Sequence, residues 1–206
     1  MSIEKPTIEQ PETNKARIIL EVGAGLFPSP YGMSNKPDDN TRYIAIEPSQ
    51  TKTKRLNAVL RHEERKDVIR ARGEALPIAS EKINEVILQN VIGDPRITEK
   101  EDDREGLETS LKDIISEIHR VLQDGGVVHI IETYTPNWQK PDDVRLLFEK
   151  NGFALTKKVV MKDPLETTGK TREQFKPFMR GEYVGIGSYL LEFTKLPAEH
   201  ANETKS

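Results

Sequence analysis

Short apolar runs alternate along the chain with longer stretches in which apolar residues recur every three or four positions. The short runs lie at 16–22, 43–46, 68–71, 84–89, 127–131, 153–161 and 183–193. Runs of this length, bounded by polar residues or glycine, are typical of buried strands. Because the strands alternate with helical patterns, the sequence predicts an α/β fold with a parallel sheet. The polar stretch 163–180 is ambiguous.

Three stretches predict helices. Ser49 is the expected N-cap of the first, Gly125-Gly126 is expected to end the second, and the third spans Pro141–Asn151. Their expected buried positions are Leu56, Val59 and Leu60 in the first, Leu107, Leu111, Ile114, Ile115, Ile118, Val121 and Leu122 in the second, and Val144, Leu147 and Phe148 in the third. The spacing in the second is the most regular amphipathic pattern of the chain.

A doubly wound sheet would normally start a helix directly after Gly25, and this chain does not have the sequence for one. The segments Phe27–Gly32 and Lys36–Asn40 contain three prolines and a glycine. Proline and glycine at this density predict a loop instead.

The chain has 206 residues, which fits one domain. We expect that domain at 17–196, between a flexible polar leader, 1–16, and a flexible polar tail, 197–206. With 31 basic and 34 acidic residues the net charge is −3, which does not indicate a nucleic-acid-binding protein. The absence of cysteine excludes disulfides, thiolate zinc sites and cysteine nucleophiles. No secretory signal and no apolar stretch of membrane-spanning length is found, so we expect a cytoplasmic protein without a membrane span.

The first strand ends in Glu21-Val22-Gly23-Ala24-Gly25, and Glu47 ends the second strand 22 residues after Gly25. Glycines at a strand end let a ligand approach the backbone, and an acid about 20 residues later can accept hydrogen bonds from a ribose diol. A tight turn and an ordinary exposed glutamate are the alternatives. The dinucleotide fingerprint GxGxxG is not met, because Pro28 occupies the third glycine position.

Five strings together resemble the class I S-adenosylmethionine-dependent methyltransferases, in particular the methyltransferase type 11-like domains. They are IILEVGAG (18–25), YIAIEPS (43–49), RGEALPIASEKINEVILQN (72–90), EIHRVLQDGGVVHIIE (117–132) and the weaker LLFEKNGF (146–153). They occur in the family's order over about two thirds of the chain. The resemblance implies a Rossmann-like, doubly wound, mostly parallel sheet of about seven strands, with an antiparallel C-terminal strand and a loop in place of the first helix.

The resemblance also implies S-adenosylmethionine as cofactor. The cofactor-binding residues that it implies are Glu21, Gly23, Ala24, Gly25, Glu47, Pro48, Gly73, Glu74 and Gln89. Gly23 and Gly25 would line the methionine end, Glu47 would hold the ribose hydroxyls, and Gly73 with Glu74 would lie near the adenine. Gln89 and Asn90 would face the cofactor and the substrate entrance.

Three departures from the family pattern matter. Phe27 stands where many relatives have a third glycine, and the first helix is a loop. Arg72 stands where relatives often carry an aspartate that meets the adenine amino group. An arginine has no acceptor, so adenine recognition would use the backbone or another acceptor. Asn84 also replaces a common aspartate.

Methyl transfer from a sulfonium needs positioning of the acceptor more than a dedicated catalytic residue. If a base is required, the candidates near predicted strand ends are Asp94, Glu132 and Tyr134. Their alternative roles are a turn at Asp94-Pro95 and the sheet edge for the other two. We expect no metal, because the four histidines show no ligand-like spacing.

The sequence thus predicts a methyltransferase that acts by in-line displacement on a small-molecule substrate. The alternatives are a catalytically inactive methyltransferase-like binding module and, less favoured because of Pro28, a nicotinamide-dependent oxidoreductase. Residues 52–72 hold eight basic and three acidic residues, which could contact RNA phosphates or form a solvated helix face. No aromatic platform is interleaved with them, so the solvated face is favoured.

Overall fold

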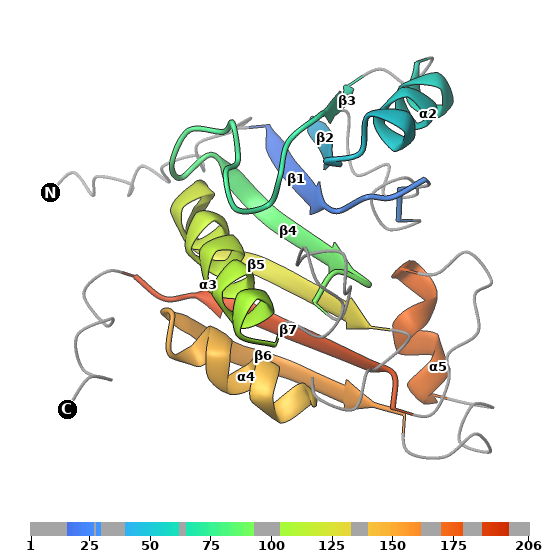
Figure 1. Ribbon diagram of the computed structural model, residues 1–206. Helices are drawn as coiled ribbons and strands as arrows, with labels where there is room; N and C mark the ends of the chain where they lie inside the picture. The colour runs from blue at the N-terminus through green and yellow to red at the C-terminus, as the bar shows by residue number, and fades with distance from the viewer. Residues whose placement is uncertain are drawn as a thin grey trace, which may run out of the picture.

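The computed structural model describes residues 16–26, 28–29, 40–61, 65–92, 104–132, 140–161, 170–178 and 187–197, and Figure 1 shows them as one sheet flanked by helices. The strands are β1 (Arg17–Val22), β2 (Thr41–Ile46), β3 (Lys66–Ile69), β4 (Ile83–Gln89), β5 (Leu122–Glu132), β6 (Phe153–Val160) and β7 (Tyr189–Lys195). The helices are α2 (Gln50–Leu60), α3 (Arg104–Val121), α4 (Pro141–Glu149), α5 (Lys170–Phe175) and the short 3₁₀ helix η3 (Lys176–Phe178).

The seven strands form one sheet in the order β3-β2-β1-β4-β5-β7-β6. The strands from β3 to β5 pair in parallel, and β7 is antiparallel to both β5 and β6. The strand order reverses between β1 and β4. In open α/β sheets such a switch point opens a crevice at the carboxyl ends of the strands. The expected mostly parallel, seven-stranded, Rossmann-like sheet with an antiparallel C-terminal strand is confirmed.

Two apolar layers cover the two faces of the sheet. On one face, α3 and α4 pack through Ile115, Ile118 and Phe148 against strand residues such as Leu88. On the other face, the core contains Leu56 and Leu60 of α2 and Phe175 of α5, together with Phe178. In Figure 1 α3 and α4 lie on the same face of the sheet. The alternation of side chains along each strand therefore supplies both cores.

The helix α2 begins as predicted. The Ser49 hydroxyl accepts a hydrogen bond from the Lys52 backbone N–H and caps the helix. Leu56 and Leu60 are fully buried, but Val59 is 42% exposed, so its place in the predicted apolar stripe was wrong. Residues 56 and 60 are one turn apart, whereas residue 59 points about a quarter turn away from the centre of that face.

The predicted stop at Gly125-Gly126 was wrong. The helix α3 ends at Val121, and β5 begins at the next residue, Leu122. The pairing of β4 with β5 shifts register between Leu122 and Val127, so the two glycines lie in an irregular part of the strand. Gly125 has φ +72°, which explains a glycine there. The regular pairing starts at Val127, where the apolar pattern predicted the strand.

The other differences are small. The third strand spans 66–69 rather than 68–71, and residues 170–178 of the ambiguous stretch form α5 and η3. The predicted start of the last strand at Tyr183 lies outside the described residues, and the strand runs from Tyr189 to Lys195. Residues 28 and 29 are not helical, and the rest of the predicted loop up to residue 39 lies outside the described ranges.

No helix in the described part of the chain is long and apolar enough to cross a membrane.

Candidate functional site

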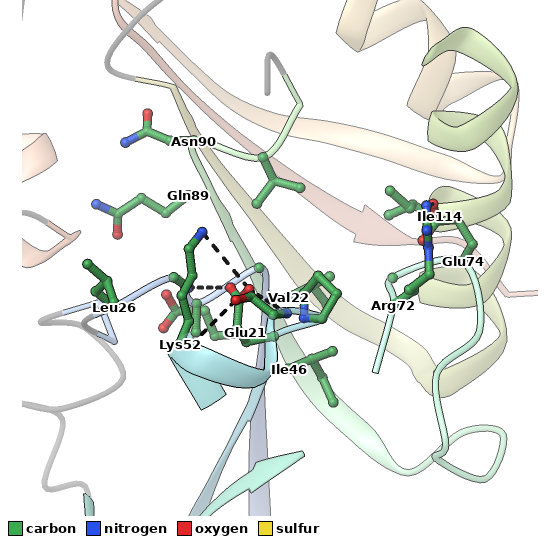
Figure 2. A pocket seen from close by; sticks show the side chains of 18 residues that line it. Glu21, Val22, Leu26, Ile46, Lys52, Arg72, Glu74, Gln89, Asn90 and Ile114 are labelled. Atoms are coloured by element: carbon green, nitrogen blue, oxygen red, sulfur yellow. Dashed lines mark hydrogen bonds and ion pairs between the residues drawn. The ribbon is translucent and has the colours of Figure 1, made fainter. Parts of the chain in front are cut away.

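A cavity of about 700 Å³ opens at the carboxyl ends of β1, β2 and β4, where the strand order reverses. Figure 2 shows the residues around it. Among the described residues, its lining consists of Glu21, Val22, Gly23, Ala24, Gly25, Leu26, Ile46, Glu47, Pro48, Ser49, Lys52, Arg72, Gly73, Glu74, Gln89, Asn90, Val91 and Ile114. Ligand pockets commonly have volumes of roughly 300–1,000 Å³, so this one is large enough for a nucleoside derivative.

The turn after β1 requires its two glycines. Gly23 and Gly25 have φ of +74° and +66°, a region that other residues rarely adopt. The N–H groups of Gly23 and Ala24 both donate to the carbonyl of Ile46, at 2.8 and 3.1 Å, which fixes the turn to the end of β2. A Cβ at Gly23 would lie 2.8 Å from Val91 Cγ2. The turn is thus held between the ends of β2 and β4.

Glu47 directly follows β2 and is only 3% exposed. Its Oε2 accepts from the Gly25 N–H and its Oε1 from the Ser49 N–H, both at 2.9 Å. Lys52 Nζ lies 4.0 Å from Oε1. A carboxylate has about four acceptor positions, so two remain for a ligand that enters the cavity. The side chain therefore joins the glycine turn to the start of α2, and it lines the cavity.

Glu21 holds the chain that leaves the glycine turn. Its carboxylate accepts from the Ser29 N–H, at 2.9 and 3.2 Å from the two oxygens, and from the Tyr43 hydroxyl. Glu21 is 2% exposed and Ser29 is equally buried. The residue therefore orders the backbone after β1.

Arg72, Glu74 and Ile114 lie together on one side of the cavity, away from Gln89, Asn90 and Leu26 (Figure 2). The Arg72 guanidinium donates to Glu74 Oε1 at 3.1 Å. A Cβ at Gly73 would lie 3.1 Å from both Ile114 Cγ1 and Val22 Cγ1, so the backbone passes close to an apolar wall. An apolar wall beside a carboxylate suits a flat base with an amino group.

Gln89 and Asn90 bring two side-chain amides to the opposite side of the cavity. Asn90 has φ +53°, a conformation that asparagine tolerates better than most residues. Its N–H donates to the carbonyl of Ile131 at 2.8 Å. The end of β4 therefore turns sharply at Asn90.

The structure brings all nine predicted cofactor-binding residues to this one cavity. Of the three candidate bases, Asp94 and Tyr134 lie outside the described residues, and Glu132 is not in the lining. Sequence reasoning did not single out Lys52, Ile46 or Ile114 as site residues. Lys52 could have been found from its place in the first turn of the helix that follows Glu47, whereas Ile114 comes from a distant helix.

Glu132, the candidate base that the structure describes, is the last residue of β5. Its Oε1 accepts from the N–H groups of Val91 and Ile92, both at 2.9 Å, and the residue is 2% exposed. Burial, and then the negative charge of Glu132, raise the pKa of Tyr189. Glu132 thus fixes the backbone just beyond Asn90, and Val91 in turn contacts the glycine turn.

A second polar cluster crosses the sheet away from the cavity. His129 on β5 lies 2.8 Å from Glu85 Oε1 on β4 and 3.3 Å from Glu192 Oε2 on β7, and Arg17 on β1 pairs with Glu85. Burial lowers the pKa of His129, but hydrogen bonds to Glu192 and Glu85 outweigh it and hold the pKa above its usual value. Within the described ranges, no group of three or more acidic or histidine side chains could hold a metal ion.

Comparison with protein-family models and with curated proteins yields no match. Comparison with solved structures does, at probability 1.00. One match is a chain of the complex between the Haloferax volcanii Trm112 methyltransferase activator and a methyltransferase, with 12% identity, TM-score 0.59 and coverage of 90% of this chain and 85% of that one. Another is a SAM-dependent methyltransferase from Aquifex aeolicus, with 12% identity, TM-score 0.58 and coverage of 89% and 84%.

The chain has the class I methyltransferase fold. The seven-stranded order and the position of the cavity at the switch point agree with this likeness. A third similar structure is the [4+2]-cyclase SpnF, with 14% identity, TM-score 0.59 and coverage of 89% of this chain and 76% of that one. The class I methyltransferase fold thus includes a protein named for another reaction, and the function has to be argued from the cavity itself.

Proposed function

We propose that the chain is an S-adenosylmethionine-dependent methyltransferase. The observation that carries the proposal is the juxtaposition of Glu47 with the Gly23–Gly25 turn at the rim of one open cavity. Glu47 lines the cavity, and its two backbone hydrogen bonds use two of the about four acceptor positions of a carboxylate, so we assign the remaining capacity to the two hydroxyls of a ribose. Because the glycines of the turn have no side chains, the amino-acid part of the cofactor can lie against the backbone there.

We assign the other lining residues to the two ends of the cofactor, the base and the methionine. Gly73 and Glu74 flank the base, beside the apolar wall of Val22 and Ile114. Because Arg72 cannot accept a hydrogen bond, Glu74 takes the acceptor role toward the adenine amino group, with Arg72 bound to one of its oxygens. The methionine end lies toward Gly23, Gly25 and Gln89.

The bound cofactor supplies an activated methyl group, so the protein contributes position and exclusion of water. Gln89 and Asn90 lie across the cavity from Arg72 and Glu74 (Figure 2), and we assign to their side-chain amides the orientation of the methyl acceptor. We take the acceptor to be a small molecule, since the described lining of the cavity contains only two basic residues, Lys52 and Arg72, and is not an extended basic groove.

Isothermal titration calorimetry of the full chain tests the proposal. S-adenosylhomocysteine and S-adenosylmethionine should bind, and NADH should not. No heat of binding at millimolar S-adenosylhomocysteine would overturn the proposal, and binding of NADH alone would favour an oxidoreductase. Mass spectrometry of small molecules that copurify with the chain gives an independent measurement.

A second candidate is a chain that binds the cofactor without transferring its methyl group. Arg72 at the usual aspartate position and the likeness to a structure named as a cyclase favour it. Incubation with methyl-labelled S-adenosylmethionine and a small-molecule extract separates the two. Release of S-adenosylhomocysteine with labelled product supports the methyltransferase, whereas tight binding without release supports the second candidate.

A further inference from the structure

The loop between β3 and β4 is held by two side chains of α3 that do not line the cavity. The Arg120 guanidinium donates to the carbonyls of Ile78 and Leu76, at 2.7 and 3.0 Å. Glu117 Oε2 accepts from the Leu76 N–H at 2.8 Å. Leu76 follows Glu74 by only two residues, so these bonds act on the segment that carries the base end of the cavity.

The two side chains also bind each other. Arg120 donates through Nε to Glu117 Oε1 at 2.7 Å and through Nη2 to Glu117 Oε2 at 2.8 Å. The hydrogen bond from Arg120, before any other interaction, lowers the pKa of Glu117. A bidentate arginine–carboxylate pair has a fixed geometry, so both groups present their remaining hydrogen bonds to the loop in a defined direction.

The same helix reaches the cavity one turn earlier. Ile114 lines the cavity, and residues 114, 117 and 120 follow one another at helical spacing on one face of α3. The end of α3 holds the far end of the loop as well, since the carbonyls of Arg120 and Val121 accept from the N–H groups of Glu81 and Lys82. The wall of the cavity and the conformation of the loop are therefore set by one rigid element.

We propose that Glu117 and Arg120 are positioning residues for the nucleoside base. They hold Gly73 and Glu74 at a distance from Ile114 that leaves room for the base, and they place the Glu74 carboxylate to accept a hydrogen bond from the adenine amino group. This inference rests on the proposed function. An arrangement that served stability alone would need no connection between the loop and the helix turn beside the cavity. Here a Cβ at Gly73 would lie 3.1 Å from Ile114 Cγ1, so the loop backbone runs close to the side chain that lines the cavity.

The test compares two ligands that differ only at the base, S-adenosylhomocysteine and S-inosylhomocysteine. Their affinity ratio in the full chain reports recognition of the adenine amino group, independently of the ribose and the amino acid. The wild type should prefer the adenine ligand by about tenfold, the value of one good hydrogen bond to a charged group. Arg120→Met should weaken adenine-ligand binding about tenfold and remove most of that preference. Glu117→Gln, a milder change, should reduce both in the same direction.

Arg145→Met on α4 is the matched control. Arg145 binds Glu149 at 2.8 Å within its own helix, but none of its hydrogen bonds reaches the loop backbone. All affinities are measured at a temperature at which denaturation shows each variant to be folded. The control should keep both the affinity and the ratio.

The outcomes separate the two proposals. If the wild type binds neither ligand, the proposed function fails and this inference falls with it. If the wild type binds and prefers adenine, but folded Glu117→Gln and Arg120→Met keep wild-type affinity and ratio, only the positioning role is overturned. Loss of stability in those variants without any change in the ratio would likewise assign them a structural role. A wild type that binds both ligands equally also overturns the inference.

Discussion

Glu47 and Glu132 are two buried carboxylates at strand ends with the same local chemistry and different surroundings. Each is at most 3% exposed, and each accepts two backbone N–H groups. Glu47 uses one oxygen for each donor and lines the cavity, whereas Glu132 uses a single oxygen for both and does not line it. An acid at a strand end therefore predicts a backbone-holding role, and its place in the sheet decides whether it can also meet a ligand.

The largest expected effect that separates them is on ligand affinity. In the proposed function Glu47→Ala removes the acceptor of two ribose hydroxyls, and it leaves the Gly25 and Ser49 N–H groups without their carboxylate. S-adenosylhomocysteine affinity should fall about 100-fold, since two hydrogen bonds to a charged group are lost. Calorimetry measures it, with Glu132→Gln as the control that should bind like the wild type. Equal loss in the two variants would abolish the distinction.

The second effect is on stability. Glu132→Ala leaves the buried N–H groups of Val91 and Ile92 without an acceptor, which should lower the free energy of unfolding by about 2–3 kcal/mol. Glu132→Gln keeps an acceptor oxygen and should lose less than half of that. Urea denaturation of the three proteins gives the values. An alanine variant as stable as the wild type would refute the backbone-holding role.

The third effect concerns the packing of Val91, whose N–H binds Glu132, against Gly23. Gly23→Ala places a methyl group 2.8 Å from Val91 Cγ2 at a φ of +74°. We therefore expect the free energy of unfolding to fall by about 1–3 kcal/mol. Adding Val91→Ala should restore part of it by relieving the contact, while the strain of the positive φ remains. Chemical denaturation in a double-mutant cycle measures the coupling. Strict additivity would show that the two residues do not interact.

The smallest effect comes from the polar cluster away from the cavity. Because the folded-state pKa of His129 is raised, its contribution to stability is complete below the unfolded pKa near 6.5 and is lost as the pH rises through the higher folded value. The unfolding free energy should fall above pH 6.5 by at most about 1.4 kcal/mol per pH unit. His129→Gln should remove that slope.

His119 provides the control for the pH experiment. Burial, and then the charge of Lys195, lower its pKa, so its contribution is present above the unfolded pKa and is lost as the pH falls below it. His119→Gln should therefore change the acid side of the stability curve and leave the slope above pH 6.5 intact. A His119→Gln variant without that upper slope would contradict the assignment to His129.

Local patterns were enough to predict the strands, the Ser49 cap and, at the cavity, the glycine turn with Glu47. Alternation and branching fix which segments are strands, and a glycine turn followed by an acid fixes which strand ends matter. The other residues of the lining that were predicted, among them Gly73, Glu74 and Gln89, came from the family resemblance and not from a local pattern. Their roles toward a ligand remain predictions.

Long-range partners could not be predicted in the same way. Glu117 and Arg120 act on backbone atoms about 40 residues earlier in the sequence, and backbone acceptors carry no sequence signal. The same holds for Glu132, whose donors are the N–H groups of Val91 and Ile92. Gly125-Gly126 misled for another reason: a glycine pair fits a helix stop and a register break equally well from sequence alone.

The direct passage from Val121 in α3 to Leu122 in β5 limits how this chain can be rearranged. Lys195 Nζ donates to the Leu122 carbonyl at 2.8 Å, so the last strand is fastened to that same residue. New termini made by circular permutation, or a tag inserted at this joint, would separate the helix from its strand without any spare residue to absorb the gap. Engineering of the protein should therefore leave the joint between Val121 and Leu122 intact and place any insertion in the irregular, exposed part of β5 at Asp124 and Gly125.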